Sequence, residues 1–175
     1  NSENIIKKVE EIDRHIQGAL EETRQIIHDL RPMSLDDLGL IPTLENYIKE
    51  FNESKRITVL FRLIDRYDLA TKIPSALSVA VFRIIQEALN NVYKHSEATT
   101  ATVSVEILNN VLKLEVIDNG KGFDVSETLR NIRVNGNFGL LGMKERVDLV
   151  DGEINIKSSK NSGTKIEVSI PWNFL

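Results

Sequence analysis

The chain contains no cysteine among its 175 residues, so it has no disulfide, no thiolate nucleophile and no cysteine-ligated metal. No apolar run approaches the roughly 20 residues that a membrane-spanning helix needs, and no signal peptide stands at its start. Two common nucleotide signatures are missing: the P-loop G-x-x-x-x-G-K-[ST], and G-x-G-x-x-G after a strand. There is no internal repeat. These absences exclude disulfide scaffolds and P-loop enzymes.

The remaining composition is that of an ordinary globular domain. Hydrophobic residues make up 41% and charged residues 27% of the chain, and this length usually forms one compact domain with room for an appendage. The net charge of −4, from 22 basic and 26 acidic side chains, argues against a direct nucleic-acid partner. Because the chain begins at Asn1 in what reads as the middle of a helix, we expect a fragment of a longer protein.

Residues 1–31 predict one long helix with an unbroken heptad seam. Its seam positions follow a 4-3-4-3-4-3-4 spacing: Ile5, Val9, Ile12, Ile16, Ala19, Thr23, Ile26 and Leu30. A single helix cannot bury this stripe alone, so we expect a partner helix; a helix lying on its own domain is the alternative. Pro32 ends the helix. We predict a linker over 32–39 and a separate domain over 40–175.

The rest of the chain alternates between helical and strand periodicity. Apolar residues lie on one helical face from Leu44 to Phe51, and Pro74 opens a helix that runs to about His95. Alternating patterns predict strands over 57–63, 101–107, 111–117, 154–156 and 166–170, with a short helix over 140–150. Asn109-Asn110 predicts a tight turn. This order, α-αβα-ββ-α-ββ, predicts an α+β two-layer sandwich with helices on one face of a mixed, mostly antiparallel sheet.

The stretch Asp118-Asn119-Gly120-Lys121-Gly122 stands at the exit of a predicted strand. A carboxylate there can accept a hydrogen bond from an amino group, such as the exocyclic amine of adenine. The glycines can take positive φ and let a flat ligand approach the backbone. On this stretch alone, an ordinary turn is the competing interpretation.

Polar residues on the helix before it have chemistry that suits a metal-nucleotide. At 100° per residue, Glu87, Asn91 and Lys94 fall in roughly a 60° arc beside the apolar face. An amide oxygen at Asn91 is a hard ligand for Mg²⁺, and Lys94 is a point charge for phosphate. His95 falls nearer the apolar side, where it could cap the helix or touch phosphate. A solvated helix flank is the alternative.

Two later turns complete the set. Gly139-Leu140-Leu141-Gly142-Met143 opens a helix, and backbone N–H groups at a helix start bind phosphate. The hydroxyl of Thr164, after Gly163, could meet adenine or a bridging water. Each has an ordinary turn as its alternative.

Together, the four stretches have the order and spacing of a known motif set. Glu87-x-x-x-Asn91-x-x-Lys94-His95, Asp118-x-Gly120-x-Gly122, Gly139-x-x-Gly142-Met143 and Gly163-Thr164 resemble the N, G1, G2 and G3 boxes. Those boxes belong to the GHKL (Bergerat-fold) ATP-binding domain of sensor histidine kinases, gyrase-type topoisomerases, Hsp90 and MutL. The run from Asp29 to Leu40 resembles the junction between dimerisation and ATPase domains in histidine kinases that work with NarL/LuxR-type response regulators. DegS-like kinases are the nearest group, with LiaS, VraS and DesK types as alternatives.

The resemblance implies a protein-histidine kinase that takes ATP and Mg²⁺. Asp118 would bind the adenine amine, with Gly120 and Gly122 shaping the pocket and Thr164 beside it. Asn91 would hold Mg²⁺ on the triphosphate with Glu87 beside it, the two forming the catalytic pair. The resemblance further implies that six residues lie near the phosphates or the ribose: Lys94, His95, Gly139, Leu140, Gly142 and Met143. Residues 123–138 would form a short ATP lid.

The resemblance also implies what the chain lacks. Residues 1–31 match the second helix of a dimerisation hairpin, while the family's phosphorylated histidine lies on the first. His28-Asp29 imitates that motif, but Pro32 follows and the required glutamine is missing. We therefore expect no phosphoacceptor in this chain, a homodimeric parent, a NarL/LuxR-type regulator as partner and a cytoplasmic domain. Whether the parent is membrane-anchored stays open.

Three other functions compete with this interpretation. An ATP-hydrolysing clamp would use Glu87 to activate water, but it needs a lysine from a following domain. An anti-sigma serine kinase has the same boxes without a long heptad helix. An ATP-insensitive dimerisation module would have decayed boxes, whereas all four are intact here.

Overall fold

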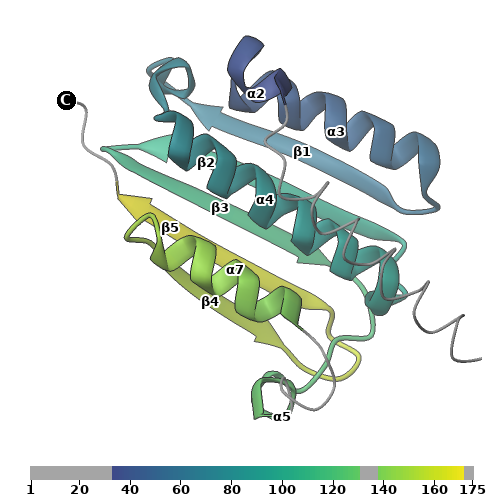
Figure 1. Ribbon diagram of the computed structural model, residues 1–175. Coiled ribbons are helices and arrows are strands. Elements are labelled where there is room, and N and C mark those ends of the chain that lie inside the picture. The colour runs from purple at the N-terminus through teal and green to yellow at the C-terminus, as the bar shows by residue number, and fades with distance from the viewer. Residues whose placement is uncertain (1–32, 131–137, 172–175) are drawn as a thin grey trace, which may run out of the picture. The chain divides into compact units, whose positions relative to one another are not determined.

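The computed structural model describes residues 33–130 and 138–171 (Figure 1). The chain divides into two compact units, Asn1–Met33 and Ser34–Leu175. The predicted heptad helix and residues 131–137 of the predicted lid lie outside the described residues. The architecture below is that of the second unit.

A single five-stranded sheet forms the base of the domain, in the order β1-β2-β3-β5-β4. β1 runs parallel to β2, and every other neighbouring pair is antiparallel. The strands are β1 (Thr58–Asp65), β2 (Thr100–Leu108), β3 (Val111–Asp118), β4 (Glu153–Ser158) and β5 (Thr164–Pro171). The sheet is therefore mixed and mostly antiparallel, as predicted.

Three main helices lie on one face of this sheet: α3 (Leu40–Ser54), α4 (Ser75–Asn91) and α7 (Phe138–Asp148) (Figure 1). This confirms the predicted two-layer α+β class. Three short helical segments were not predicted: α2 (Met33–Asp37), the 3₁₀ turn η1 (Leu69–Lys72) and α5 (Val125–Arg130). No helix in the described ranges has the length and apolarity to cross a membrane.

The core lies between the helices and the sheet. Ile84, Ile85 and Leu89 of α4 are fully buried, and they face the alternating inward residues of the central strands, such as Val103 and Leu114. This period-2 burial explains the strand patterns. Leu35 of α2 is also in the core, only 5% exposed. The segment 32–39, for which the sequence predicts a linker, thus contributes to the domain's packing; the domain limits stay a prediction.

The turns follow their local chemistry. Asn109 and Asn110 both have positive φ, 51° and 61°, which is the backbone of a two-residue turn between antiparallel strands. They join β2 to β3, as predicted. Lys121–Asp124 follows the end of β3, and the β4–β5 connection lies against it, so the sequence-distant Gly122 and Gly163 meet there.

Candidate functional site

Asp118 is the last residue of β3 and is only 7% exposed. Its Oδ1 accepts a hydrogen bond from the Gly120 N–H at 2.7 Å. It pairs in register with Thr164 of β5, and hydrogen bonding by Thr164 acts to lower the pKa of the Asp118 carboxyl. Burial raises the pKa of this carboxyl above its usual value, and the bonds from Gly120 and Thr164 only partly oppose that rise. The site therefore contains a sheltered acid with fixed acceptor geometry.

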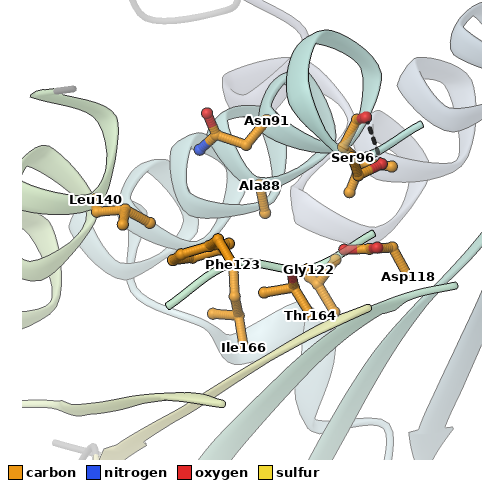
Figure 2. Close-up of a pocket in the computed structure, with 11 residues that line it drawn as sticks. Ala88, Asn91, Ser96, Asp118, Gly122, Phe123, Leu140, Thr164 and Ile166 are labelled. Atoms are coloured by element: carbon orange, nitrogen blue, oxygen red, sulfur yellow. Dashed lines mark hydrogen bonds between the residues drawn. The ribbon is translucent and has the colours of Figure 1, made fainter. Parts of the chain in front are cut away.

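A pocket opens beside Asp118 between α4, β3, β5 and the start of α7 (Figure 2). It is lined by Ala88, Asn91, Val92, Ser96, Val116, Asp118, Gly122, Phe123, Leu140, Thr164 and Ile166. Apolar side chains form most of the wall, and Asp118 carries the one ionisable group among these described residues. A flat, mostly apolar ligand with an amino group suits such a pocket.

The loop after Asp118 is held against the end of α4. The Lys121 N–H donates to the Ser96 carbonyl at 2.8 Å, and Asn119 Oδ1 accepts from the N–H groups of Thr99 and Thr100, each at 3.0 Å. A Cβ on Gly120 would overlap the Ser96 carbonyl. The first glycine of D-x-G-x-G, Gly120, is therefore needed because the backbone of Ser96 approaches it closely.

Ser96 belongs to a π-helical turn, Val92–Ser96, that continues α4. Its Oγ donates to the Val92 carbonyl at 2.6 Å and accepts from the Ala98 N–H at 3.0 Å. The sequence predicts a helix to about His95, and none of the four motifs includes Ser96; Asn119 falls at an unspecified position of D-x-G-x-G. The one local signal in the sequence was Ser96 itself, because a serine at a helix end can hydrogen-bond to neighbouring backbone groups.

Lys94 and His95 both lie on the π turn. A regular 100° step places His95 nearer the apolar side, but its side chain is exposed, as is that of Lys94. Neither lines the pocket. The predicted orientation of His95 is wrong because a π turn has more residues per turn than an α-helix. Their contact with phosphate or ribose stays a prediction.

Gly122 and Gly163 need glycine for two reasons. Their φ values are 60° and 66°, in the left-handed region. A Cβ on Gly122 would overlap the Ser159 carbonyl, and one on Gly163 would overlap the Asp118 carbonyl. The second and fourth predicted motifs, far apart in sequence, are therefore packed backbone to backbone.

Asn91 lines the pocket, and Glu87 and Gly139 lie next to it. Asn91 Nδ2 lies 3.4 Å from Glu87 Oε1, one helical turn away. A Cβ on Gly139 would overlap the same Glu87 oxygen, so the start of α7 lies directly against Glu87. Burial, and then the negative charge of Glu87, raises the pKa of the Tyr47 hydroxyl on α3 to about 12. Tyr47 thus stays neutral beside the carboxylate; the sequence indicated only its place on the α3 core face.

Two further residues of the third motif take other positions. Met143 lies on α7 with its side chain fully buried in the core, so it packs this helix onto the domain. Gly142 lies under the Arg146 side chain, whose Nη1 would be 2.9 Å from an added Cβ. Leu140 lines the pocket. The structure therefore brings Asn91, Asp118, Gly122, Leu140 and Thr164 together around one cavity. Gly120 and Glu87 contact residues that line it, and Gly139 lies against Glu87.

The donor set at Glu87 and Asn91 fits a magnesium ion that keeps ligands from phosphate and water. It offers a carboxylate and an amide oxygen one turn apart, both hard donors. Within the described ranges, no three His, Asp or Glu side chains cluster closely enough to hold a metal themselves. A metal here would depend on a ligand for its other partners.

The chain is similar in sequence to a known ATPase family and to curated histidine kinases. The family described as "Histidine kinase-, DNA gyrase B-, and HSP90-like ATPase" matches residues 76–173. The chain is 42% identical over 166 residues to "Signal transduction histidine-protein kinase/phosphatase DegS" of Brevibacillus brevis, covering 95% of this chain and 41% of that protein. It is 45% identical over 142 residues to DegS of Bacillus subtilis (strain 168), covering 81% and 36%.

A third relative and two solved structures agree. "Sensor histidine kinase LiaS" of Bacillus subtilis (strain 168) is 34% identical over 166 residues, covering 95% of this chain and 43% of the relative. The histidine kinase AdeS of Acinetobacter baumannii superposes with a TM-score of 0.62 at 16% identity, covering 92% of this chain and 84% of that one. The Erythrobacter litoralis EL346 blue-light activated histidine kinase gives 0.59 at 21%, covering 75% and 41%. The two structures support the fold alone, and the chain spans less than half of each curated relative.

Proposed function

The chain belongs to the family of histidine kinase-, DNA gyrase B- and HSP90-like ATPases, and from this premise we propose that it is the catalytic part of a DegS-like sensor histidine kinase. The expected resemblance to DegS-like kinases is confirmed by the identities above. Binding ATP is the property this family implies. The parent protein would transfer the γ-phosphate of ATP to a histidine, and from there to an aspartate of a response regulator.

The observation that carries the proposal is the sheltered carboxylate of Asp118 at the base of an apolar pocket. Its Oδ1 is occupied by the Gly120 N–H, and the Thr164 hydroxyl lies beside it. A carboxylate so placed accepts from an exocyclic amine and discriminates against a ring that presents a carbonyl. At position 6 of the purine ring adenine has an amine and guanine a carbonyl, so we expect the site to bind ATP in preference to GTP.

At the phosphate side, Asn91 and Glu87 would hold Mg²⁺ through their oxygens. When bound, the ion supplies positive charge that offsets the charge on the phosphates. Glu87 also orients the Asn91 amide, since it accepts from Nδ2 and so leaves Oδ1 free as a ligand. The start of α7 packs on Glu87 at Gly139, and we expect its backbone N–H groups to bind the same phosphates.

The histidine that receives phosphate would come from the first dimerisation helix of the parent. His95 is exposed on the π turn and does not line the pocket, and His15 and His28 lie outside the described residues. Phosphoryl transfer needs a nucleophile in line with the γ-phosphate, and positioning supplies most of its rate. Homodimerisation, a NarL/LuxR-type regulator and a cytoplasmic location complete the proposal.

The test is transfer of labelled phosphate in trans. The chain is incubated with γ-labelled ATP, alone and with a supplied dimerisation domain that carries the His-Asp motif. We expect acid-labile label on the supplied domain and none on the chain alone. Asn91→Asp should impair transfer at least tenfold, because it places a negative charge beside the phosphates and changes the metal's ligands.

Asn90→Asp is the matched control, since it adds the same charge one residue away and Asn90 does not line the pocket. It should transfer at close to the wild-type rate. Acid-labile label on His28 of the chain alone would show that the phosphoacceptor is misplaced. Rapid hydrolysis with no transfer to any histidine would contradict the kinase proposal and favour an ATPase clamp.

A further inference from the structure

Ser158 ends β4 and belongs to none of the four motifs. Its side chain is half-buried, and its Oγ makes three polar contacts. The Phe123 N–H donates to it at 2.9 Å, it donates to the Gly163 carbonyl at 2.8 Å, and it lies 3.2 Å from Thr164 Oγ1. One oxygen thus joins the chain just after the D-x-G-x-G loop to both residues of the Gly163-Thr164 turn.

The directions of these bonds follow from counting protons. A serine hydroxyl has one proton, and the Gly163 carbonyl can only accept, so the Ser158 proton goes to Gly163. The Thr164 hydroxyl has Ser158 Oγ at 3.2 Å, and the carboxylate of Asp118, its cross-strand partner, is a second acceptor whose pKa Thr164 acts to lower. The carboxylate is charged and is the stronger acceptor, so the Thr164 proton goes to Asp118.

The position of Gly163 makes the placement of the Thr164 hydroxyl sensitive to any movement of the Gly163-Thr164 turn. Gly163 has a left-handed φ and lies in backbone contact with Asp118. A shift of the Gly163-Thr164 turn would therefore move the Thr164 hydroxyl relative to the carboxylate. Ser158 opposes that shift by bonding the turn on one side and the Phe123 N–H on the other.

We propose that Ser158 is a positioning residue for adenine recognition: it fixes the Gly163-Thr164 turn against the D-x-G-x-G loop, so that the Thr164 hydroxyl donates to Asp118. The inference rests on the proposed nucleotide site and extends it to a residue outside its motifs. Ser158 itself does not line the pocket, so it acts through Thr164.

Removing the hydroxyl has two consequences. The Phe123 N–H and the Gly163 carbonyl each lose a partner in a half-buried place, which loosens both segments. The Asp118 carboxylate loses a well-placed donor, so its pKa rises further above its usual value. Because the ionised carboxylate is a stronger acceptor for the adenine amine than the protonated carboxyl, nucleotide affinity should then begin to fall at a higher pH as the solution is acidified.

The experiment is calorimetric titration of the wild-type chain, Ser158→Ala, Ser158→Thr and Ser159→Ala with Mg-ADP over a range of pH. Ser159 is the matched control, because it is the next residue along and its side chain is exposed. We expect Ser158→Ala to bind about five- to twentyfold more weakly, with the midpoint of its acid-side loss moved to higher pH. Ser158→Thr, which keeps the hydroxyl, and Ser159→Ala should stay within about twofold of wild type.

Two results would overturn the inference while leaving the proposed function intact. One is wild-type affinity in Ser158→Ala, and the other is weaker binding with an unmoved midpoint or without rescue by Ser158→Thr, which indicates packing alone. Failure of the wild-type chain to bind Mg-ADP would instead contradict the proposed function, and this inference with it. Should Ser158→Ala not fold, Ser158→Cys takes its place, since a thiol keeps the volume but bonds weakly.

Discussion

Asp118 combines two properties that oppose each other, a place in the interior and a charge needed for binding. Burial raises the pKa of its carboxyl. The folded state therefore binds a proton at Asp118 more tightly than the unfolded state does. The stabilisation this provides is present below the carboxyl's ordinary pKa and is lost as the pH rises through the folded value. At neutral pH, the ionised group is retained for recognition at a cost in stability.

Asp118→Asn should separate the two properties. One acceptor oxygen becomes a donor that faces the adenine amine, so ADP binding should weaken by roughly 1–3 kcal/mol. The melting temperature at neutral pH should not fall, because an ionised buried group is replaced by a neutral one of the same shape. The difference in melting temperature between mutant and wild type should shrink as the pH falls below the carboxyl's range. A large loss of stability at neutral pH would contradict this account.

Gly163→Ala should show how tightly the two ligand loops are packed. The added Cβ meets a left-handed φ of 66° and overlaps the Asp118 carbonyl. Gly39→Ala is the control, since Gly39 has a φ of 81° but nothing within 4 Å of an added Cβ. Chemical unfolding should show a cost of about 1–3 kcal/mol at Gly39 from backbone strain alone, because its ψ of -179° places it in a region that is essentially limited to glycine. A larger cost, together with weaker ADP binding, is expected at Gly163; equal costs would show that the overlap relaxes freely.

At the scale of elements, the free edge of β1 is protected by a side chain. Asn52 of α3 donates from Nδ2 to the Val59 carbonyl at 3.0 Å, and its Oδ1 accepts from the Val59 N–H at 2.7 Å. This carboxamide replaces one residue of a missing neighbouring strand. It also ties α3 to the sheet, which is one way to limit edge-to-edge pairing.

Asn52→Ala should lower the free energy of unfolding by about 1–3 kcal/mol, because two partly buried backbone groups lose their partners. Asn52→Asp keeps only the bond from the Val59 N–H, so its free energy of unfolding should fall between those of wild type and Asn52→Ala. Urea unfolding measures both, and light scattering reports any gain in self-association. Glu53→Ala, an exposed change at the next position, should leave stability within about 0.5 kcal/mol. An unchanged Asn52→Ala would mean that water replaces the amide without loss.

At the scale of the molecule, all pocket residues come from the second compact unit. The lining runs from Ala88 to Ile166, and the unit begins at Ser34. The same unit includes Leu35, whose side chain belongs to its core. The ligand site and the packing that supports it are thus contained in one part of the chain.

A truncated chain that begins at Ser34 should fold and bind Mg-ADP within about twofold of the full chain, by calorimetry. A shorter one that begins at Leu40 loses α2 and the buried Leu35 side chain. It should lose about 2–4 kcal/mol of stability, by analogy with the removal of a buried leucine side chain. Equal stability of the two truncations would show that α2 contributes nothing, and lost binding in the longer one would place part of the site upstream.

The sequence by itself determined the features that depend on neighbouring residues. Period-2 alternation, the Asn109-Asn110 turn and the spacing of the polar motifs are local, so the fold class, the family resemblance and the position of Asp118 at a strand end could be predicted. Met143 illustrates the limit, since motif membership does not say whether a side chain faces ligand or core.

Tertiary structure decided what depends on residues far apart. The parallel pairing of β1 with β2 and the insertion of β5 between β3 and β4 involve strands separated by whole helices. The π turn at Val92–Ser96 brings the Ser96 carbonyl to the Lys121 N–H. One of the three contacts of Ser158 is to Phe123, 35 positions earlier. Such hydrogen bonds depend on how the folded elements meet, and no local periodicity encodes that meeting.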